Sequence, residues 1–367
     1  MSKKRIKRIT VKVGSRVLTD ESNRINRMVI KALTDQIVTL RERGIEVIVV
    51  SSGAIASGLG LLNIKKTGRS LSELQAIASI GQNYLMDLYN NQLRKKGYIA
   101  GQLLLTQEDL NDRKRFLNIR YTLNTLFKYN AIPIVNENDS VSTEEIKCGD
   151  NDRLSSLVAD ISDSNMLIIL TDVEGVYGEE GAIIKYVETV TDDIRSLCKG
   201  KGCEESSGGM ISKLDAANNA ALAGIESVIA RGKTKNIILK IIDGQEVGTR
   251  FSSCKKPLQA RKRWIAFSLK PKGKIIVDRG AIKALVEKHK SLLPGGILEV
   301  CGKFSEGALI EIASAGKKVI ARGLSNYSSE EIEKIKGKRT DQIEIELGYK
   351  DYDEVVHRDN LVVINSE

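Results

Sequence analysis

The sequence predicts an α/β protein, with a three-layer α/β/α domain around a mainly parallel central sheet, followed by a small C-terminal β-barrel domain. Three observations predict it. Short, continuously apolar segments alternate with helical patterns up to about residue 245. Polar or glycine-rich residues follow these segments, as is typical of parallel strands that end at a ligand site. From Lys272 onward the pattern changes to short strand-like runs, and a chain of 367 residues is long enough for two domains.

Five short segments predict the parallel strands. Each is rich in Val and Ile, and its apolarity is continuous rather than alternating, which indicates burial on both faces. A sheet of this kind is covered by helices on both sides. The segments are ITVKV (Ile9–Val13), IEVIVV (Ile45–Val50), AIPIV (Ala131–Val135), MLIIL (Met166–Leu170) and SVIA (Ser227–Ala230).

One long helix is expected between these strands, over Ser72–Lys96. Ser72 and Gln75 have the spacing of a capping box, which satisfies backbone donors at the start of a helix. An apolar stripe at helical spacing follows the cap. Its members are Leu74, Ile77, Tyr84, Leu85 and Leu88.

The C-terminal part predicts a β-rich domain. Runs such as KIIVD and ALIEIA are separated by turn signals such as PGG and SAGKK, with one short helix near Ala281–His289. We place the first domain at residues 1–268 and the second at 272–355. The segment CKKPLQARKRWIAF is the expected junction.

The chain carries an excess of positive charge. Lys and Arg number 57 against 47 Asp and Glu, a formal net charge of +10. Residues 251–290 concentrate this excess, with 12 basic and 2 acidic residues. Such a stretch is typical of a solvated connector, or of a surface that attracts a polyanion.

Targeting and metal-binding signals are weak. No apolar segment of 7–15 residues follows the basic start, and no run approaches the roughly 20 apolar residues of a membrane helix, so we expect a cytoplasmic protein. The five cysteines form no C-x-x-C, and the histidines are His289 and His357, which predicts reduced thiols and no structural zinc. Cys148 lacks a histidine nearby in sequence, so a nucleophilic role is not favoured.

The residues after four of the predicted strands are the strongest functional signal. They read GSR, SSGAIASG, NENDS and TDVEG, and the third continues into a stretch of acids and amides up to Asp152. A single polar stretch of this kind is typical of a surface loop. Four such tips meet at one edge of a parallel sheet, and this coincidence favours a ligand site.

Two segments predict contacts with phosphate. Lys12–Ser15 and Ser206–Lys213 each combine glycine and hydroxyl residues with a lysine, so that backbone N–H groups and a positive charge can approach a phosphate. Neither has the Walker A spacing, and either alone is typical of a turn. Two such lysines from opposite ends of a domain favour phosphoryl transfer, in which charge stabilisation supplies most of the catalysis.

The motifs KVGSRVLT, VSSGAIASG, FLNIRYTLNTLF, IPIVNENDSV, EIKCGDNDRLS, LTDVEGVY, SGGMISKLDAA and KRW resemble, in order and spacing, those of the glutamate 5-kinases within the amino acid kinase family. NEND followed by GDND is the most specific part. The C-terminal part resembles a PUA domain, a small β-barrel often associated with RNA. The resemblance covers essentially the whole chain. It implies ATP-dependent phosphorylation of the γ-carboxylate of L-glutamate to L-glutamyl 5-phosphate, the first step of proline biosynthesis, with Mg²⁺ as cofactor and L-proline as inhibitor.

The resemblance also implies roles for individual residues. Lys12 and Lys213 would hold the transferring phosphoryl group from two sides, and Asp152 would orient both lysines. Glutamate would be bound by Ser52, Asp139, Asp150 and Asn151, with Asp139 at its ammonium end and Asn151 at its carboxylate end. No residue is assigned to the metal. The residues expected at the nucleotide are Lys12, Thr171, Asp172, Ser207, Gly208, Gly209, Met210, Ile211, Ser212 and Lys213.

Two departures from the family pattern lie near these residues. Arg16 follows the first phosphate-binding segment, where it is expected to reshape the phosphate cradle. Arg153 follows GDND and adds a charge beside the site. The segment at 191–206 is shorter than is typical of the family, which indicates a trimmed flap over the nucleotide.

Two alternative functions stay open at this point. A kinase acting on N-acetylglutamate or aspartate would share the lysines but should lack the NEND and GDND pair. An RNA-binding regulator is favoured by the basic segment and the PUA-like part, although aromatic residues make up only 4% of the chain and no stacking platform is evident. We expect L-glutamate and ATP as ligands, assembly into a homo-oligomer, contact of the C-terminal domain with RNA, and no membrane partner.

Overall fold

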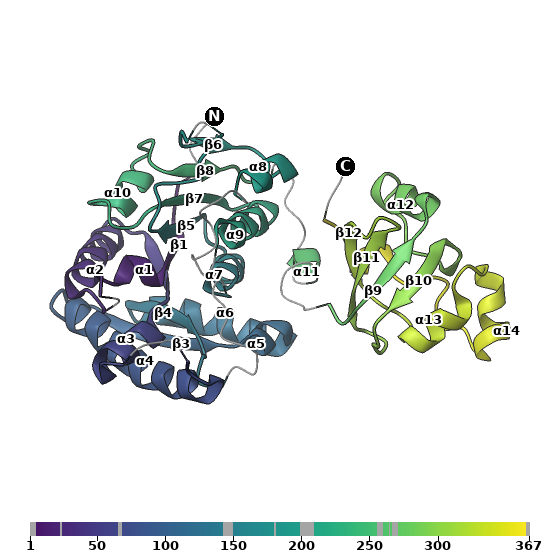
Figure 1. The fold of residues 1–367 in the computed structure, drawn as a ribbon, viewed down its shortest axis with the longest axis horizontal. Coiled ribbons are helices and arrows are strands. Elements are labelled where there is room, and N and C mark those ends of the chain that lie inside the picture. Colours follow the sequence, from purple (N-terminus) through teal and green to yellow (C-terminus); the bar gives the residue numbers. More distant parts are fainter. Residues whose placement is uncertain are drawn as a thin grey trace. The chain divides into compact units, whose positions relative to one another are not determined.

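The computed structural model describes residues 5–22, 24–64, 68–141, 150–179, 181–198, 209–254, 260–263, 265 and 271–364. The chain divides into two compact units, Met1–Pro257 and Leu258–Glu367. Figure 1 labels the elements of both units. Among the described residues, no helix combines the length and the apolarity needed to span a membrane.

An eight-stranded sheet forms the centre of the first unit, in the order β3-β4-β2-β1-β5-β7-β8-β6. The first six strands in this order run parallel, β8 is antiparallel to β7, and β6 pairs in parallel with β8. The five predicted parallel strands are therefore confirmed. The bounds are β1 (Arg8–Val13), β2 (Glu46–Ser51), β3 (Ile99–Leu105), β4 (Ala131–Glu137), β5 (Met166–Thr171), β6 (Tyr186–Val187), β7 (Glu226–Arg231) and β8 (Thr249–Phe251).

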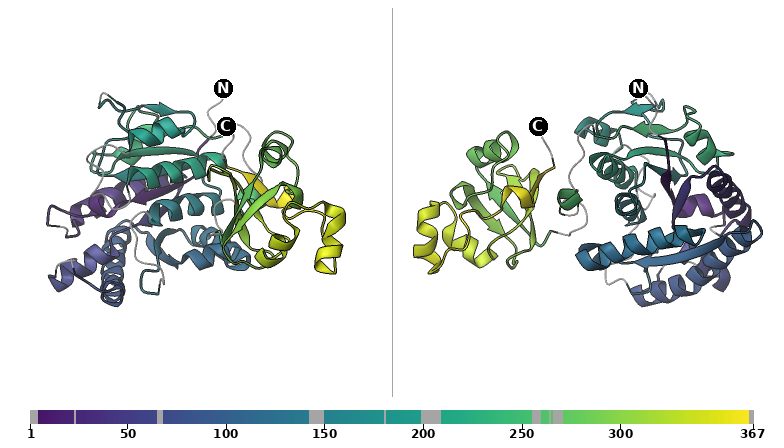
Figure 2. Two further views of the ribbon diagram at one scale, coloured as in Figure 1. Left: turned by 45° about the vertical axis from the view of Figure 1, so that its right-hand side comes forward. Right: turned by 180° about the vertical axis from the view of Figure 1, so that it is seen from behind.

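Helices cover both faces of this sheet (Figures 1 and 2). One face packs against α2 (Arg27–Glu42), α4 (Leu71–Arg94) and α10 (Ile237–Ile242), and the other against α6 (Arg113–Lys128), α7 (Asp150–Ile161) and α9 (Met210–Leu222). Neighbouring residues of β5 face opposite sides: Ile168 belongs to the first core and Ile169 to the second. This double burial explains the continuous apolarity of the strands. The shorter helices are α1 (Ser15–Leu18), α3 (Ala54–Leu62), α5 (Gln107–Asn111) and α8 (Asp192–Leu197).

The capping box expected at Ser72 and Gln75 is wrong, because α4 begins two residues earlier. The side chain of Ser70 accepts a hydrogen bond from the backbone N–H of Glu73, and the Glu73 carboxylate accepts one from the backbone N–H of Ser70. The hydrogen bonds from Ser70, together with the guanidinium of Arg69, lower the pKa of Glu73 to about 2. A carboxylate also suits the positive end of the helix dipole, which a neutral glutamine does not.

Helices α3 and α4 cross at very close range because both carry glycine at the crossing. A Cβ atom at Gly81 would lie 1.8 Å from the carbonyl oxygen of Ala54, and one at Gly58 would lie 2.1 Å from the carbonyl oxygen of Ile77. No other residue fits at these positions without moving a helix. The crossing brings the first half of α4 against the turn that follows β2.

The second unit is built on a five-stranded sheet in the order β10-β9-β11-β12-β13. Strands β9 and β11 pair in parallel and the other pairs are antiparallel. The expected short helix is present as α12 (Arg279–Val286), and α13 (Ser329–Ile335) and α14 (Ile343–Leu347) pack against the same core. The strands are β9 (Gly273–Val277), β10 (Ile297–Cys301), β11 (Leu309–Ser314), β12 (Val319–Leu324) and β13 (Leu361–Val363). This unit also includes α11 (Ala260–Arg263).

Candidate active site

The carboxyl ends of β1, β2 and β5 are joined to one another beyond the last residues of the strands. The N–H of Gly14 donates to the carbonyl of Leu170 at 3.1 Å, and the N–H of Ser52 donates to the carbonyl of Val13 at 3.0 Å. These hydrogen bonds continue the pairing of the sheet into the turns. The polar tips identified in the sequence are therefore held side by side, as expected for the crevice of a parallel α/β sheet.

The centre of this edge is a carboxylate held between two lysines. Lys12 comes from β1, Asp152 from the first turn of α7 and Lys213 from the first turn of α9. Lys12 Nζ lies 2.7 Å from Asp152 Oδ1, and Lys213 Nζ lies 3.2 Å from Asp152 Oδ2. Asp152 is fully buried, whereas the side chains of Lys12 and Lys213 are 7% and 12% exposed to solvent. Both ammonium groups therefore reach the edge of the site while the carboxylate stays behind them.

Asp152 is ionised in this arrangement. Burial raises the pKa of Asp152, but the positive charges of Lys12 and Lys213 and the hydroxyl of Ser212 outweigh burial and hold it below its ordinary value. Ser212 Oγ donates to Asp152 Oδ2 at 2.7 Å. Two ammonium groups and one carboxylate leave one positive charge, which suits an anionic ligand.

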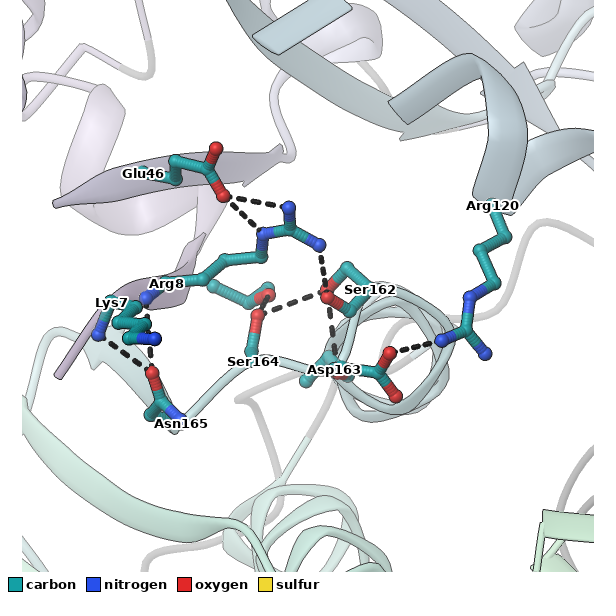
Figure 3. A network of polar contacts seen from close by, with 10 residues as sticks. Lys7, Arg8, Glu46, Arg120, Ser162, Asp163, Ser164 and Asn165 are labelled. Carbon is teal, nitrogen blue, oxygen red and sulfur yellow. Dashed lines mark hydrogen bonds and ion pairs between the residues drawn. The ribbon is translucent and has the colours of Figure 1, made fainter. Parts of the chain in front are cut away.

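A network at the far ends of β1 and α7 ties these two elements together (Figure 3). Asn165 Oδ1 accepts from the backbone N–H of Arg8 at 3.1 Å, and the Arg8 guanidinium donates to the carbonyl of Ser162. Lys12 and Asp152 lie at the opposite ends of the same strand and helix. The relative position of the two charged groups is thus set by the anchoring of their main chains as well as by their own ion pair.

A chain of side-chain hydrogen bonds runs from the turn after β2 to helix α4. Asn151 Nδ2 donates to Ser52 Oγ and to Asn136 Oδ1, both at 3.0 Å. Asn136 Nδ2 donates to Gln82 Oε1 at 2.9 Å, and Asn136 Oδ1 also accepts from the N–H of Glu137 at 2.9 Å. Asn136 and Gln82 are buried. The structure therefore joins Ser52 and Asn151, two of the predicted substrate residues, through one hydrogen-bond chain.

Asp139 lines a cavity of about 210 Å³ beside this chain. Gln82 and Asn83 of α4, Gln102 of β3 and Glu137 of β4 contribute polar groups to its walls. The remaining lining residues are Ala54, Ala78, Ser79, Leu104, Asn138 and Ser140. The cavity has the size and polarity of a site for a small polar molecule.

The residues expected at the nucleotide lie at the end of β5 and the start of α9. Thr171 is buried and its Oγ1 donates to Asp172 Oδ1 at 3.0 Å. Gly209 is the residue that precedes α9, so the free N–H groups of this helix start there. Met210 and Ile211 pack against the core of the second face, so their backbone rather than their side chains would serve a ligand.

Arg16 binds one of these predicted nucleotide residues directly. Its Nη1 donates to Asp172 Oδ2 at 3.2 Å, and both side chains are partly exposed. Burial raises the pKa of Asp172, but Arg16 and Thr171 outweigh this and lower it. The departure seen in the sequence therefore adds a cation beside a residue that is predicted to contact the nucleotide.

Several residues that were singled out in the sequence lie outside the part of the chain that the structure describes. They are Ser207, Gly208, Cys148, the tryptophan of the KRW motif (Trp264) and the side chain of Asp150.

Sequence reasoning missed Gln82 and Asn136. Asn136 stands in the quoted NEND motif, and Gln82 is a polar residue on the buried stripe of α4 that includes Ala78, Leu85 and Tyr89. A glutamine on an apolar stripe is a signal for a buried hydrogen-bond partner.

The fold and the site together define an α/β protein with two lysines that pair with one buried carboxylate near the ends of its parallel strands. Residues 7–231 match the amino acid kinase family, and residues 273–347 match the PUA domain. Curated proteins named glutamate 5-kinase align over nearly the whole chain. The relative from Caldanaerobacter subterraneus subsp. tengcongensis is 46% identical over 97% of this chain and 98% of its own.

Two further relatives of the same name support this grouping. The relative from Thermoanaerobacter pseudethanolicus is 44% identical over 97% of this chain and 98% of its own, and that from Trichlorobacter lovleyi is 45% identical over 98% and 97%. The chain therefore belongs to the amino acid kinase family, within its glutamate 5-kinase branch, and it carries a PUA domain.

Proposed function

We propose that this chain transfers the γ-phosphoryl group of ATP to the γ-carboxylate of L-glutamate, giving L-glutamyl 5-phosphate, the first intermediate of proline biosynthesis. The observation that carries the proposal is the pair of lysines held on the fully buried Asp152. The names of relatives at 44–46% identity supply the reaction. The fold supplies the crevice at the strand ends in which both substrates would meet.

The proposed chemistry requires charge neutralisation rather than a general base. The attacking carboxylate of glutamate is ionised at neutral pH, so no proton has to be removed from it. Its repulsion from the γ-phosphate is the barrier, and Lys12 and Lys213 would reduce it by binding the phosphoryl oxygens from two sides. Asp152 would keep the two ammonium groups in place, since its carboxylate binds both of them.

Mg²⁺ would accompany ATP as its phosphate complex and would add positive charge at the phosphates. Within the described part of the chain, no three His, Cys, Asp or Glu side chains are grouped closely enough to hold a metal ion. Proteins that use MgATP bind the cation through one or two carboxylates together with the phosphates of the substrate. We assign no side chain to the metal, and the roles of Lys12 and Lys213 are independent of it.

Recognition of glutamate would use the cavity lined by Asp139 together with Ser52 and Asn151. The carboxylate of Asp139 suits a free ammonium group. Acylation of the nitrogen would remove this positive charge, and with it the attraction between the substrate and the Asp139 carboxylate. Asp150 would lie beside these residues, and Thr171, Asp172 and the segment from Ser207 to Lys213 would contact the nucleotide.

A panel of acceptor acids tests the proposal. The purified full-length chain is incubated with MgATP and L-glutamate, N-acetyl-L-glutamate or L-aspartate, and acyl phosphate is trapped as its hydroxamate. We expect product with L-glutamate and at least a hundredfold less with the acylated acid. Equal rates with L-glutamate and N-acetyl-L-glutamate would overturn the assignment of the substrate. ADP formation without hydroxamate would overturn the assignment of the γ-carboxylate as the phosphoryl acceptor.

We further infer that L-proline competes with L-glutamate, because it presents the same α-carboxylate beside a cationic nitrogen. Raising glutamate should relieve the inhibition, and inhibition that persists at saturating glutamate would indicate a separate site. Assembly into a homo-oligomer, a cytoplasmic location and contact of the C-terminal unit with RNA stay predictions, the last motivated by the PUA match and the basic residues at 251–290.

A further inference from the structure

We propose that Gln82 is a positioning residue for substrate recognition. Through Asn136 it fixes the amide of Asn151 so that the carbonyl oxygen of Asn151 accepts a hydrogen bond from the ammonium group of the substrate. This inference rests on the proposed function, because it takes L-glutamate as the substrate. It also reverses the expected polarity of Asn151, which the sequence reasoning placed at the carboxylate end.

The orientation of Asn136 follows from a backbone donor. The N–H of Glu137 donates to Asn136 Oδ1 at 2.9 Å, and a backbone N–H can only donate. The oxygen of this amide must therefore face Glu137, which turns Nδ2 toward Gln82. Gln82 Oε1 accepts that hydrogen bond at 2.9 Å, so the two ends of the Asn136 amide are held independently.

The orientation of Asn136 in turn determines that of Asn151. Asn136 Oδ1 faces the Asn151 amide at 3.0 Å, and an acceptor at this distance requires the NH₂ group of Asn151 rather than its oxygen. The same NH₂ group donates to Ser52 Oγ. Both hydrogens of Asn151 are then committed to the protein, and its side chain has no donor left for a substrate carboxylate.

The carbonyl oxygen of Asn151 is buried and has no hydrogen-bond partner among the residues that the structure describes. A buried acceptor without a donor is destabilising, so such an atom calls for an explanation. An ammonium group carries three hydrogens and can serve two acceptors at once. The Asn151 oxygen and the Asp139 carboxylate are suitable acceptors for one ammonium group.

Gln82 is well placed to hold this chain in position. It is buried, it lines the same cavity as Asp139, and it directly follows Gly81. The close contact of Gly81 with the backbone of Ala54 fixes how α4 packs against α3. It thereby fixes the position of the Gln82 side chain. Its role requires an acceptor at the end of the side chain. Methionine fills a similar volume without that acceptor, and glutamate retains it.

The test compares L-glutamate with glutarate, which has both carboxylates but no amino group. The Michaelis constant of the full-length chain is measured for L-glutamate and for ATP, and the inhibition constant for glutarate as a competitor. The variants are Gln82→Met, Gln82→Glu and the control Gln92→Met, a matched change at a partly buried position near the end of α4. Thermal unfolding of each variant checks that it is folded.

We expect Gln82→Met to raise KM for L-glutamate about tenfold while kcat, KM for ATP and the inhibition constant of glutarate change less than twofold. Gln82→Glu should keep the wild-type preference for L-glutamate over glutarate, and Gln92→Met should behave as wild type. A general loosening of the site would weaken both acids equally in Gln82→Met, and that result would overturn the proposal. If Gln82→Met does not fold, loss of the amino-group preference in folded Gln82→Glu overturns it instead.

The wild-type measurement separates this proposal from the proposed function. If the wild-type chain does not phosphorylate L-glutamate, the proposed function fails and this inference falls with it. If the wild type is active and the ratio of the glutamate and glutarate constants is unchanged in Gln82→Met, only the role of Gln82 is wrong.

Discussion

Replacing Asp152 by Asn should destabilise the first unit strongly, because it removes a buried carboxylate that forms ion pairs with two nearly buried lysines. Asp152 is 0% exposed, and the side chains of Lys12 and Lys213 are 7% and 12% exposed. Removing one partner from a buried ion pair typically costs about 3–5 kcal/mol. Asn keeps the volume and can still accept from Ser212, so we expect a loss of about 3 kcal/mol, the lower end of that range.

The control for this change is Asp163→Asn, which follows the other end of the same helix. Asp163 pairs with Arg120 on the surface, where the two side chains are 56% and 38% exposed. Asp163 has a φ of 51°, a left-handed conformation that Asn also tolerates. A surface ion pair contributes about 0–1 kcal/mol, so the control should lose less than about 1 kcal/mol.

Urea unfolding at several pH values measures both losses. The pKa of Asp152 is lowered in the folded chain, so its stabilising contribution is complete above the ordinary value of 3.8 and is lost as pH falls through the lower folded value. The difference in free energy of unfolding between the wild type and Asp152→Asn should therefore be constant from about pH 7 to pH 5. It should become smaller below about pH 4.

Adding ATP at neutral pH should reduce this difference in free energy of unfolding, because the phosphates supply the negative charge that the variant lacks. The buried ion pair would not have the proposed stabilising role if Asp152→Asn lost no more unfolding free energy than Asp163→Asn. The same would follow if the loss did not become smaller in acid.

Three further predictions concern catalysis and domain organisation. Lys12→Ala and Lys213→Ala should each lower kcat at saturating substrates by about a hundredfold or more, with the circular dichroism spectrum unchanged, because they act on transition-state charge; near-normal turnover in either would remove its proposed role. Arg16→Ser should raise KM for ATP by about threefold to tenfold and weaken the dependence of this KM on salt, since it deletes a partly exposed cation and removes the ion-pair partner of Asp172; an unchanged KM would separate Arg16 from nucleotide binding. A chain ending at Pro257, the limit of the first unit, should fold and retain glutamate-dependent turnover within about tenfold, about 1.4 kcal/mol of barrier. A folded but inactive truncation would mean that the second unit completes the site.

The strands of the first unit could be predicted because double burial leaves a direct mark on composition. Val and Ile without alternation occur where both faces of a strand are covered, and the five strands found this way are all parallel members of one sheet. Strand β3 was not predicted, because Gly101 and Gln102 interrupt its apolar run and because an edge strand is only partly buried. The start of α4 was misplaced by two residues because Ser70 and Ser72 are both plausible caps, and only the hydrogen bonds decide between them.

In the site, too, the sequence predicted some features and only the tertiary structure decided others. Lys12 and Lys213 were predicted from segments that combine glycine, hydroxyl residues and a lysine, and the role of Asp152 was implied by the family resemblance. Their mutual ion pairs, the Arg16–Asp172 pair and the orientation of the Asn151 amide required the tertiary structure. Asn136 and Gln82 are 54 residues apart, and Arg16 and Asp172 are 156 apart. A sequence specifies which groups can donate or accept, but whether an amide presents its oxygen or its nitrogen depends on partners that only chain folding brings within about 3 Å.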